Sequence, residues 1–476
     1  MNELIRKYAE KFASEHSETV INDIPDADAA AWMEENVPHF TCSDKEIEET
    51  YYFRFWTFRK HIKTTPDGRV ITEFLPPVPW AGRHNVISCP VAHHISEARW
   101  LRDRELVRDD IRYMLLPSSV DNTVLYDNPL VASAAKLCVD SPDPDFGREI
   151  LPSLKALYDR IDRDQITKYG LYYTSNGCDG MEYSVSGQGL RLTMNSYMYG
   201  GAYWLSRLCA MLGDGDEKRY SAKAEELKKL INALLWDEKD GFFKCRHMED
   251  GNADADLGLS DSDRDCMEEV GFIPWIYPGL CGEEQERAFD RLTDGKHFSA
   301  PYGITVADMS HPKFMNLKVD HECMWDGPVW PFATSQTLTA VYTLLAEKES
   351  THVTPSDYMD MLSKYASSQH LTENGRTVNW IDENLHPFTG RWLARDLIVQ
   401  RGRPGAGRGE NYNHSSFCDL VLSGACGISV SGGKLTVNPL CKGKWDYFTV
   451  DNLAVGNEVF SVAFDGNSVT VREMKG

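Results

Sequence analysis

The sequence predicts a mainly α-helical fold in which helical hairpins close into a toroid, followed by a small C-terminal antiparallel β element. Apolar residues recur at helical spacing between about residues 45 and 428. Long loops separate many of the predicted helices, and a ring of hairpins is expected to gather such loops at one end. Residues 429–476 instead alternate apolar and polar side chains, which is typical of strands. We find no residue-level repeat, so the toroid is inferred from this spacing.

The individual elements follow from their periodicity and their end signals. Asn128-Pro129 marks the start of one helix and Gly213 the end of another. The segment FDGNSV at 464–469 is typical of a hairpin turn. Helices are expected over residues 45–62, 95–116, 128–140, 150–162, 192–213, 217–238, 283–294, 333–348, 355–369 and 416–427. The long loops cover residues 63–95, 171–188, 250–275, 299–332 and 380–415.

Size and charge narrow the classes of function. The chain has 476 residues, which allows two domains or one large closed architecture. The 50 Lys and Arg residues against 72 Asp and Glu residues give a net charge of 50 − 72 = −22. This balance argues against nucleic acid and anionic membranes as partners, and it is more compatible with a neutral or sugar-like substrate.

The sequence carries no targeting or cofactor signal that we recognise. Its first 20 residues, MNELIRKYAEKFASEHSETV, lack the pattern of a signal peptide, and no stretch approaches the ~18 apolar residues of a membrane span. The 12 Cys residues form no Cys-x-x-Cys pair, which disfavours a zinc cluster or a redox pair. Phosphate-loop and nucleophile-elbow motifs are also missing. We expect a reduced, cytoplasmic protein without a cofactor or a metal.

The first loop whose side chains could take part in catalysis is YYTSNGCDGMEYSVSG at 172–187. It contains the carboxylates Asp179 and Glu182 beside Tyr183, between two predicted helices. In an average loop these carboxylates would cap a turn or face solvent. Carboxyl groups near aromatic rings, however, have raised pKa values that suit a general acid.

The second loop is DHECMWDGPVWPFATSQ at 320–336. Trp325 and Trp330 flank a Gly-Pro pair just before an apolar helix. Such tryptophans either plug the interior or stack on the C–H faces of sugar rings. The sequence alone does not distinguish an interior plug from a sugar-stacking surface.

The third loop is GRGENYNHSSFCDLVLSG at 407–424, with Glu410, Tyr412 and His414 leading into a helix. Upstream, DENLHPFTGRWLARD adds Glu383 and Arg391 as residues that could line a site. His84, Arg391 and Arg408 are candidates to hold hydroxyl groups or a carboxylate, because Arg binds carboxylates bidentately.

A histidine-rich segment, PVAHHISEARW, suggests two further functions. His93 and Glu97 are four residues apart on a predicted helix, but no third and fourth metal ligand is evident. Hydrogen bonding to the core or to a ligand is therefore favoured over metal binding. The pair His93 and His94 would be central if the toroid were a sugar epimerase.

The order of these motifs resembles the (α/α)6-barrel glycoside hydrolases of family 63, with glucosidase I and mannosylglycerate hydrolase. Their acid loop is similar to NGCDGMEYS, and their Gly-Pro-x-Trp segment to MWDGPVWPFATSQTL. LLWDEKDGFF and EVGFIPWIYPGL also look like theirs, and the resemblance spans roughly residues 45–440. Two departures are that Asp326 precedes Gly-Pro, and that a Pro-x-Thr-Gly run follows Glu383 but not Glu410.

The resemblance implies a division into a lead-in segment (1–44), an (α/α)6-barrel catalytic domain (45–428) and a β-rich C-terminal segment (429–476). It implies an inverting α-glycoside hydrolase for a small α-linked substrate, with Asp179 as general acid and Glu410 as general base. Glu383 is a rival for the base. Glu182, Tyr183, Trp325, Trp330, Tyr412 and His414 are expected to contact the substrate with the basic residues named above. The alternatives are a histidine-based epimerase and a non-catalytic carbohydrate-binding protein.

Overall fold

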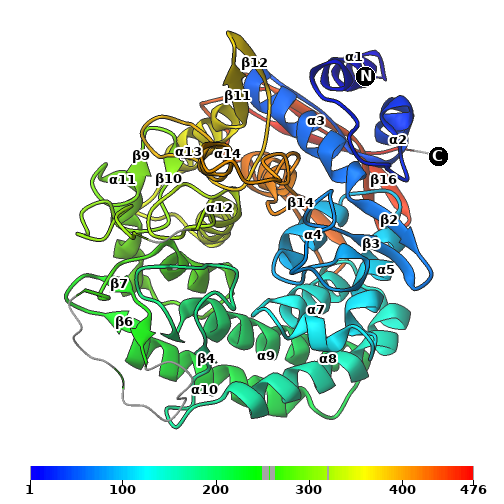
Figure 1. The fold of residues 1–476 in the computed structure, drawn as a ribbon. Coiled ribbons are helices and arrows are strands. Elements are labelled where there is room, and N and C mark those ends of the chain that lie inside the picture. Colours follow the sequence, from blue (N-terminus) through cyan, green and yellow to red (C-terminus); the bar gives the residue numbers. More distant parts are fainter. Residues whose placement is uncertain (1, 249–256, 258–262, 319–320, 475–476) are drawn as a thin grey trace.

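The computed structural model describes residues 2–248, 257, 263–318 and 321–474. It confirms the mainly helical class, and its helices form a closed ring in which the chain returns to the neighbourhood of its own start (Figure 1). Most of the first half of the predicted loop 250–275 lies outside the described residues.

Six helical elements form the inner side of the ring. Each contacts the next, and the last contacts the first. All six contribute residues to one internal cavity of about 150 Å³. In chain order they are α4 (Val91–Ala98), α7 (Leu130–Asp140), α9 (Leu192–Leu212), the 3₁₀ helix η3 (Glu269–Ile276), α12 (Pro331–Glu347), and α15 (Phe417–Asp419) with the π-helical turn η5 (Leu420–Ala425).

Five further helices lie around this inner set: α3 (Lys45–Lys60), α5 (Arg104–Leu115), α8 (Pro144–Gln165), α10 (Glu217–Leu235) and α13 (Pro355–Ser368). Each contacts at least one inner element, because its apolar stripe is buried on that side. Asp44 caps α3 by accepting from the backbone N–H groups of residues 46 and 47. Gly213 ends α9 with φ 70°, as its sequence position predicted.

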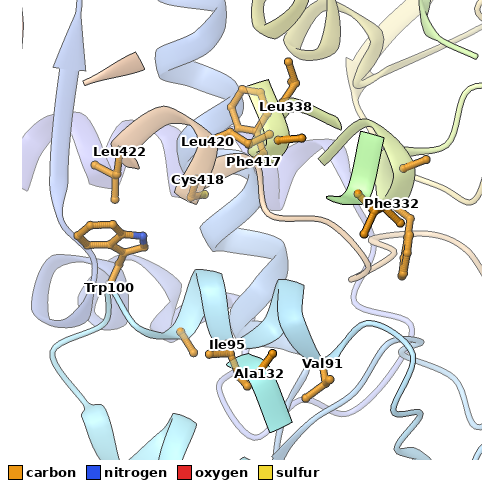
Figure 2. Packing of buried hydrophobic residues seen from close by; sticks show 14 of the residues in the cluster. Val91, Ile95, Trp100, Ala132, Phe332, Leu338, Phe417, Cys418, Leu420 and Leu422 are labelled. Atoms are coloured by element: carbon orange, nitrogen blue, oxygen red, sulfur yellow. The ribbon is translucent and has the colours of Figure 1, made fainter. Parts of the chain in front are cut away.

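Buried apolar side chains connect neighbouring inner elements. Figure 2 shows side chains of α4, α7 and α12 meeting those of the α15–η5 segment. All of the labelled residues are buried: Val91, Ile95, Trp100, Ala132, Phe332, Leu338, Phe417, Cys418, Leu420 and Leu422.

Several predicted helices differ in detail. The helix expected over 95–116 is two helices, α4 and α5, because Asp103 accepts from the backbone N–H of Glu105 and starts a new one. The segment 283–294 is the 3₁₀ helix η4 (Glu283–Phe289) followed by α11 (Asp290–Thr293). The periodicity missed α1 (Asn2–Glu15), α2 (Ala29–Asn36), α14 (Leu393–Gln400) and the short helices α6 (Val120–Thr123), η1 (Asp26–Asp28) and η2 (Arg83–Asn85). It also missed the inner element η3, which begins within the predicted loop 250–275.

The predicted C-terminal sheet is present and takes up one strand from the start of the chain. Its antiparallel order is β1-β15-β16-β17, with β1 (His39–Cys42), β15 (Phe448–Val455), β16 (Glu458–Phe464) and β17 (Val469–Met474). His39 pairs with Asp451, and the FDGNSV turn joins β16 to β17. This pairing joins the first of the three predicted segments to the third. The three-segment division itself stays a prediction.

The remaining strands are short hairpins and pairs within loops. They are β2 (Ile62–Thr65), β3 (Gly68–Ile71), β4 (Tyr173–Thr174), β5 (Gly189–Leu190), β6 (Trp236–Asp237), β7 (Phe242–Phe243), β8 (Arg246–His247), β9 (Ser299–Ala300), β10 (Gly303–Ile304), β11 (His370–Glu373), β12 (Arg376–Asn379), β13 (Ile428–Ser431) and β14 (Lys434–Val437).

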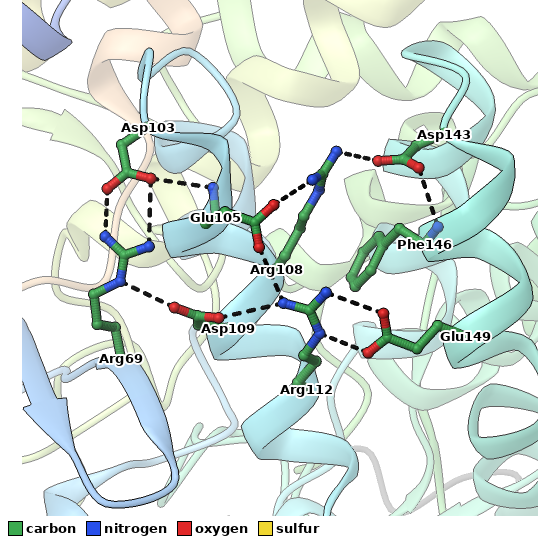
Figure 3. Close-up of polar contacts among 9 residues, drawn as sticks. All are labelled: Arg69, Asp103, Glu105, Arg108, Asp109, Arg112, Asp143, Phe146 and Glu149. Atoms are coloured by element: carbon green, nitrogen blue, oxygen red, sulfur yellow. Dashed lines mark hydrogen bonds and ion pairs between the residues drawn. The ribbon is translucent and has the colours of Figure 1, made fainter.

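A network of ion pairs covers the outer face where β3, α5 and α8 meet (Figure 3). Arg112 binds both oxygens of Glu149, at 2.6 and 3.0 Å. The network also includes Arg69, Asp103, Glu105, Arg108, Asp109 and Asp143.

In the described part of the chain, no helix is long and apolar enough to span a membrane.

Candidate active site

A cavity of about 310 Å³ lies among the long loops of the ring. Four of the five predicted long loops supply wall residues, from 63–95, 171–188, 299–332 and 380–415. The lining residues are Glu73, Phe74, Trp80, Ile87, Cys89, Tyr126, Gly180, Glu182, His321, Glu322, Cys323, Trp325, Trp330, Phe332, Glu383, Arg408, Tyr412 and His414. Cys89 and Phe332 also line the internal cavity of the ring, so the two cavities adjoin there.

Glu182 is the carboxylate that the loop 171–188 presents to this cavity. The Cys323 thiol donates to Glu182 Oε2 at 3.3 Å, and the backbone N–H of Trp325 donates to the Glu182 carbonyl at 3.1 Å. Burial raises the pKa of Glu182 above its ordinary value. The contacts from Cys323 and His321 lower it less than burial raises it.

Asp179, the predicted acid, lies in the same loop but does not line the cavity. It is 2% exposed, and its Oδ2 accepts from Arg191 Nε at 2.6 Å and from the Thr193 hydroxyl at 2.8 Å. The Arg191 guanidinium also donates to the Ser184 and Ser186 hydroxyls, each at 2.9 Å. Asp179 therefore anchors the loop on Arg191.

Glu383 lines the cavity in an ion pair with Arg408. Arg408 Nε and Nη2 donate to the two oxygens of Glu383 at 2.7 and 3.3 Å, and Nη1 donates to Glu322 at 3.0 Å. Burial tends to lower the pKa of Arg408, but the Glu383 and Glu322 carboxylates raise it overall. Arg401 and Arg403 also pair with Glu322, so this wall carries several guanidinium groups around two carboxylates.

Glu410, the predicted base, points away from the cavity. Its Oε1 pairs with His16 Nδ1 at 3.2 Å, and it is not among the lining residues. The same segment nevertheless supplies Tyr412 and His414 to the cavity wall. Between them and Glu410, Asn411 adopts φ 61°, a left-handed turn that Asn tolerates.

Trp325 and Trp330 both line the cavity and stack on each other. Their ring centroids are 4.3 Å apart at 10°. Trp330 Nε1 donates to the Met324 carbonyl at 2.8 Å. Trp325 Nε1 and His414 Nε2 are fully enclosed and have no hydrogen-bond partner among the described residues.

Three other predicted contacts lie elsewhere. His84 Nε2 pairs with Asp67 at 2.9 Å, and the Arg391 side chain is 68% exposed in a pair with Asp396. Tyr183 packs its ring against His321, 5.1 Å between centroids, but does not line the cavity.

Sequence reasoning missed several wall residues, of which Glu73 is the most informative. A single acidic residue within the run RVITEFLPPVPW, otherwise largely apolar, was a signal that could have found it. It is 5% exposed and lines the cavity. Trp80, Tyr126, His321, Glu322, Cys89 and Cys323 were also missed.

The histidine segment is built into the core. His94 pairs with the Asn413 carbonyl at 2.7 Å, and the Cys418 backbone N–H donates to Glu97 at 2.9 Å. Burial lowers the pKa of His93 to about 3 and of His94 to about 4. Neither histidine lines the loop cavity. Among the described residues, no group of three or more His, Cys, Asp or Glu is arranged to hold a metal ion.

Known proteins resemble this chain in sequence and in fold. The profile of the mannosylglycerate hydrolase MGH1-like glycoside hydrolase domain matches residues 83–415. A solved structure described as a sialidase superposes with a TM-score of 0.89 at 32% identity, over 99% of this chain and 43% of that one. A protein of Borreliella burgdorferi is 28% identical over 170 residues, 35% of this chain and 33% of that protein. The chain thus spans less than half the length of either relative.

Two more distant structures share the fold alone. The GH78 family rhamnosidase of a Bacillus species gives a TM-score of 0.60 at 14% identity, over 92% of this chain and 41% of that one. The GH63 mannosylglycerate hydrolase from Thermus thermophilus in complex with glucose gives a TM-score of 0.52 at 13% identity, over 78% of this chain and 98% of that one.

Proposed function

This chain belongs to the mannosylglycerate hydrolase MGH1-like glycoside hydrolase domain family, and we propose that it is an inverting α-glycosidase acting on a small α-linked glycoside or oligosaccharide. The observation that carries the proposal is that two carboxyl groups of different environment, Glu182 and Glu383, line one cavity. We assign the general acid to Glu182 and the general base to Glu383. This replaces the assignment of Asp179 and Glu410, because neither of those residues lines the cavity.

Glu182 suits the acid because an acid must keep its proton near neutral pH. Burial raises its pKa, and no cation contacts its carboxyl oxygens among the described residues. A protonated Glu182 would transfer its proton to the glycosidic oxygen as the bond to the anomeric carbon breaks.

Glu383 suits the base because a base must be ionised before it accepts a proton from water. Its two oxygens accept hydrogen bonds from the Arg408 guanidinium, which places a positive charge beside them. In an inverting enzyme a water molecule occupies the space between the base and the anomeric carbon, so we expect the two carboxyl groups to stand about 6.5–9.5 Å apart. The Pro-x-Thr-Gly run after Glu383 agrees with this choice.

The rest of the cavity suits a carbohydrate. The stacked pair Trp325 and Trp330 offers an aromatic wall on which a sugar ring can stack. We further propose that the closed cycle of six inner elements is the inner ring of an (α/α)6 barrel. The reaction needs no cofactor or metal, and the cytoplasmic location stays a prediction.

The test is hydrolysis of a panel of α-linked aryl glycosides and disaccharides, with the configuration of the product read by NMR. Release of the β-anomer by the wild type, lost in Glu182→Gln, supports an inverting enzyme with this acid. Glu410→Gln is the matched control, because it removes a carboxylate outside the cavity and should keep the rate. Retention of the α-anomer, or full activity of Glu182→Gln, would contradict the proposal.

A further inference from the structure

Glu73 is one of four glutamates that line the cavity, and the proposed hydrolysis does not use it. It follows β3 and shares the cavity wall with Glu182 and Glu383. Its backbone is fixed, because the Asn413 N–H donates to the Glu73 carbonyl at 3.0 Å and Asn413 Nδ2 donates to the Thr72 carbonyl at 3.2 Å. The segment that supplies Tyr412 and His414 therefore also holds Glu73 in place.

Only one oxygen of the Glu73 carboxyl has a protein partner in the described chain. The Tyr412 hydroxyl donates to Glu73 Oε1 at 2.7 Å. Oε2 makes no hydrogen bond to a described residue, and it is not among the fully enclosed atoms left without a partner. Oε2 is consequently the atom that a ligand in the cavity can reach.

The surroundings of Glu73 favour its neutral form. Burial and the Glu383 and Glu182 carboxylates raise the pKa of Glu73 to about 8, although the hydrogen bond from Tyr412 lowers it. No cation pairs with it among the described residues. The titratable groups that face it are Tyr412, Glu383, Glu182, Cys89 and Tyr126, with Arg408 and His414 on the same wall. Since Tyr412 already donates to Oε1, the proton of the neutral carboxyl belongs on Oε2.

We propose that Glu73 determines specificity by donating a hydrogen bond from Oε2 to one hydroxyl group of the bound sugar. The inference rests on the proposed function for the identity of the ligand as a sugar. A site that hydrogen-bonds a hydroxyl group discriminates strongly against the analogue that lacks it. The preferred ligands are thus sugars that carry a hydroxyl at the position facing Glu73, and the corresponding deoxy sugars are rejected.

The experiment measures sugar binding as a function of pH. D-Glucose, D-mannose and L-rhamnose are titrated calorimetrically into the wild type, Glu73→Gln and Glu182→Gln between about pH 6 and 9.5, and the tightest sugar is followed. Because the donor is lost when Glu73 ionises, wild-type affinity should fall above about pH 8, towards tenfold per pH unit. Glu73→Gln keeps an N–H donor, so its affinity should be independent of pH, and Glu182→Gln should keep the fall.

Two further arms exclude a merely structural effect. Tyr412→Phe leaves the carboxyl in place but removes the hydrogen bond that lowers its pKa, so the fall in affinity should move to higher pH. Deoxy analogues of the tightest sugar should bind the wild type about tenfold or more weakly at one position only, and Glu73→Ala should abolish that difference.

The outcomes separate this inference from the proposed function. Wild-type affinity that stays level or rises above pH 8 would show an accepting carboxylate and overturn the inference. A pH dependence that survives in Glu73→Gln would overturn it too. If the wild type hydrolyses no glycoside but binds sugar with the expected pH dependence, the hydrolase proposal fails and the role of Glu73 stands.

Discussion

Carboxylates occupy two contrasting regions of this molecule, the outer ion-pair network of α5 and α8 (Figure 3) and the loop cavity. In the network, hydrogen bonds from Arg112 lower the pKa of the half-exposed Glu149. In the cavity, burial raises the pKa of Glu73 and Glu182, and no cation contacts their oxygens among the described residues. The proton state of a carboxyl group therefore depends on whether water or a cation stabilises its charge.

Glu383 lies between the two cases, because it is buried like Glu73 yet paired with an arginine like Glu149. One cavity thus holds a carboxyl group that contacts no cation among the described residues, Glu182, and another that is paired with an arginine, Glu383. Such a difference in surroundings is what acid–base chemistry with two carboxyl groups requires.

The largest expected effect is on kcat, and it compares two arginine-paired carboxylates, Glu383 in the cavity and Glu149 on the surface. Glu383→Gln should lower kcat about 10²–10⁴-fold on an α-aryl glycoside, because it removes the proposed base. Glu149→Gln breaks an equally bidentate pair on the surface and should leave kcat unchanged. Steady-state kinetics of both variants checks this, and equal activities would contradict the assignment of Glu383.

The next effect concerns stability, at the buried pair of Asp179 and Arg191. Asp179→Asn removes the nearer carboxylate partner of the buried Arg191 guanidinium and leaves only Glu268, 3.6 Å away, so we expect the free energy of unfolding to fall by up to about 3 kcal/mol. Glu149→Gln should change it by about 1 kcal/mol or less, since exposed pairs contribute little. Denaturant unfolding of the two variants measures both values. A stable Asp179→Asn that has lost all activity would instead favour Asp179 as the acid.

The next effect is the pH dependence of stability, which has opposite signs for Glu73 in the cavity and Glu149 in the surface network. The pKa of Glu73 in the folded state is about 8, above its unfolded value, so its stabilising contribution is complete below the unfolded pKa and is lost as the pH rises towards 8. Glu73→Gln removes this loss and should be more stable than the wild type at pH 8. Glu149, with a lowered pKa, stabilises above its unfolded pKa, so Glu149→Gln should be slightly less stable there. Thermal unfolding at pH 5 and pH 8 distinguishes the two; a Glu73→Gln variant destabilised at pH 8 would refute the first.

The smallest effect is a displacement of the pH profile. Cys323 donates to Glu182 Oε2 and lowers its pKa, so Cys323→Ala should move the alkaline fall of kcat to higher pH. Cys89 lines the same cavity but donates to the Asp179 carbonyl, so Cys89→Ala is the matched control and should keep the wild-type profile. Identical profiles for Cys323→Ala and the wild type would contradict the contact.

Much of the site could be predicted from the loops, but not which carboxylate in each loop faces the cavity. Glu182 and Asp179 are three residues apart, and the sequence near them does not distinguish them. Arg191 donates to Asp179, which is buried beside it. Cys323 and the Trp325 backbone, far along the chain, donate to Glu182 at the cavity. These contacts connect loops that are remote in sequence, so local pattern could not reveal them.

Local chemistry alone determined the helical class, the C-terminal strands and the loops that supply the site, because apolar periodicity, capping residues and turn residues act over a few positions. The tertiary structure decided the direction of Glu410 towards His16, the entry of Glu73 into the cavity and the pairing of β1 with β15. Each of these depends on which distant segments meet when the ring closes. Burial and ion pairing then set the surroundings of each cavity carboxyl group, and both exist only in the folded chain.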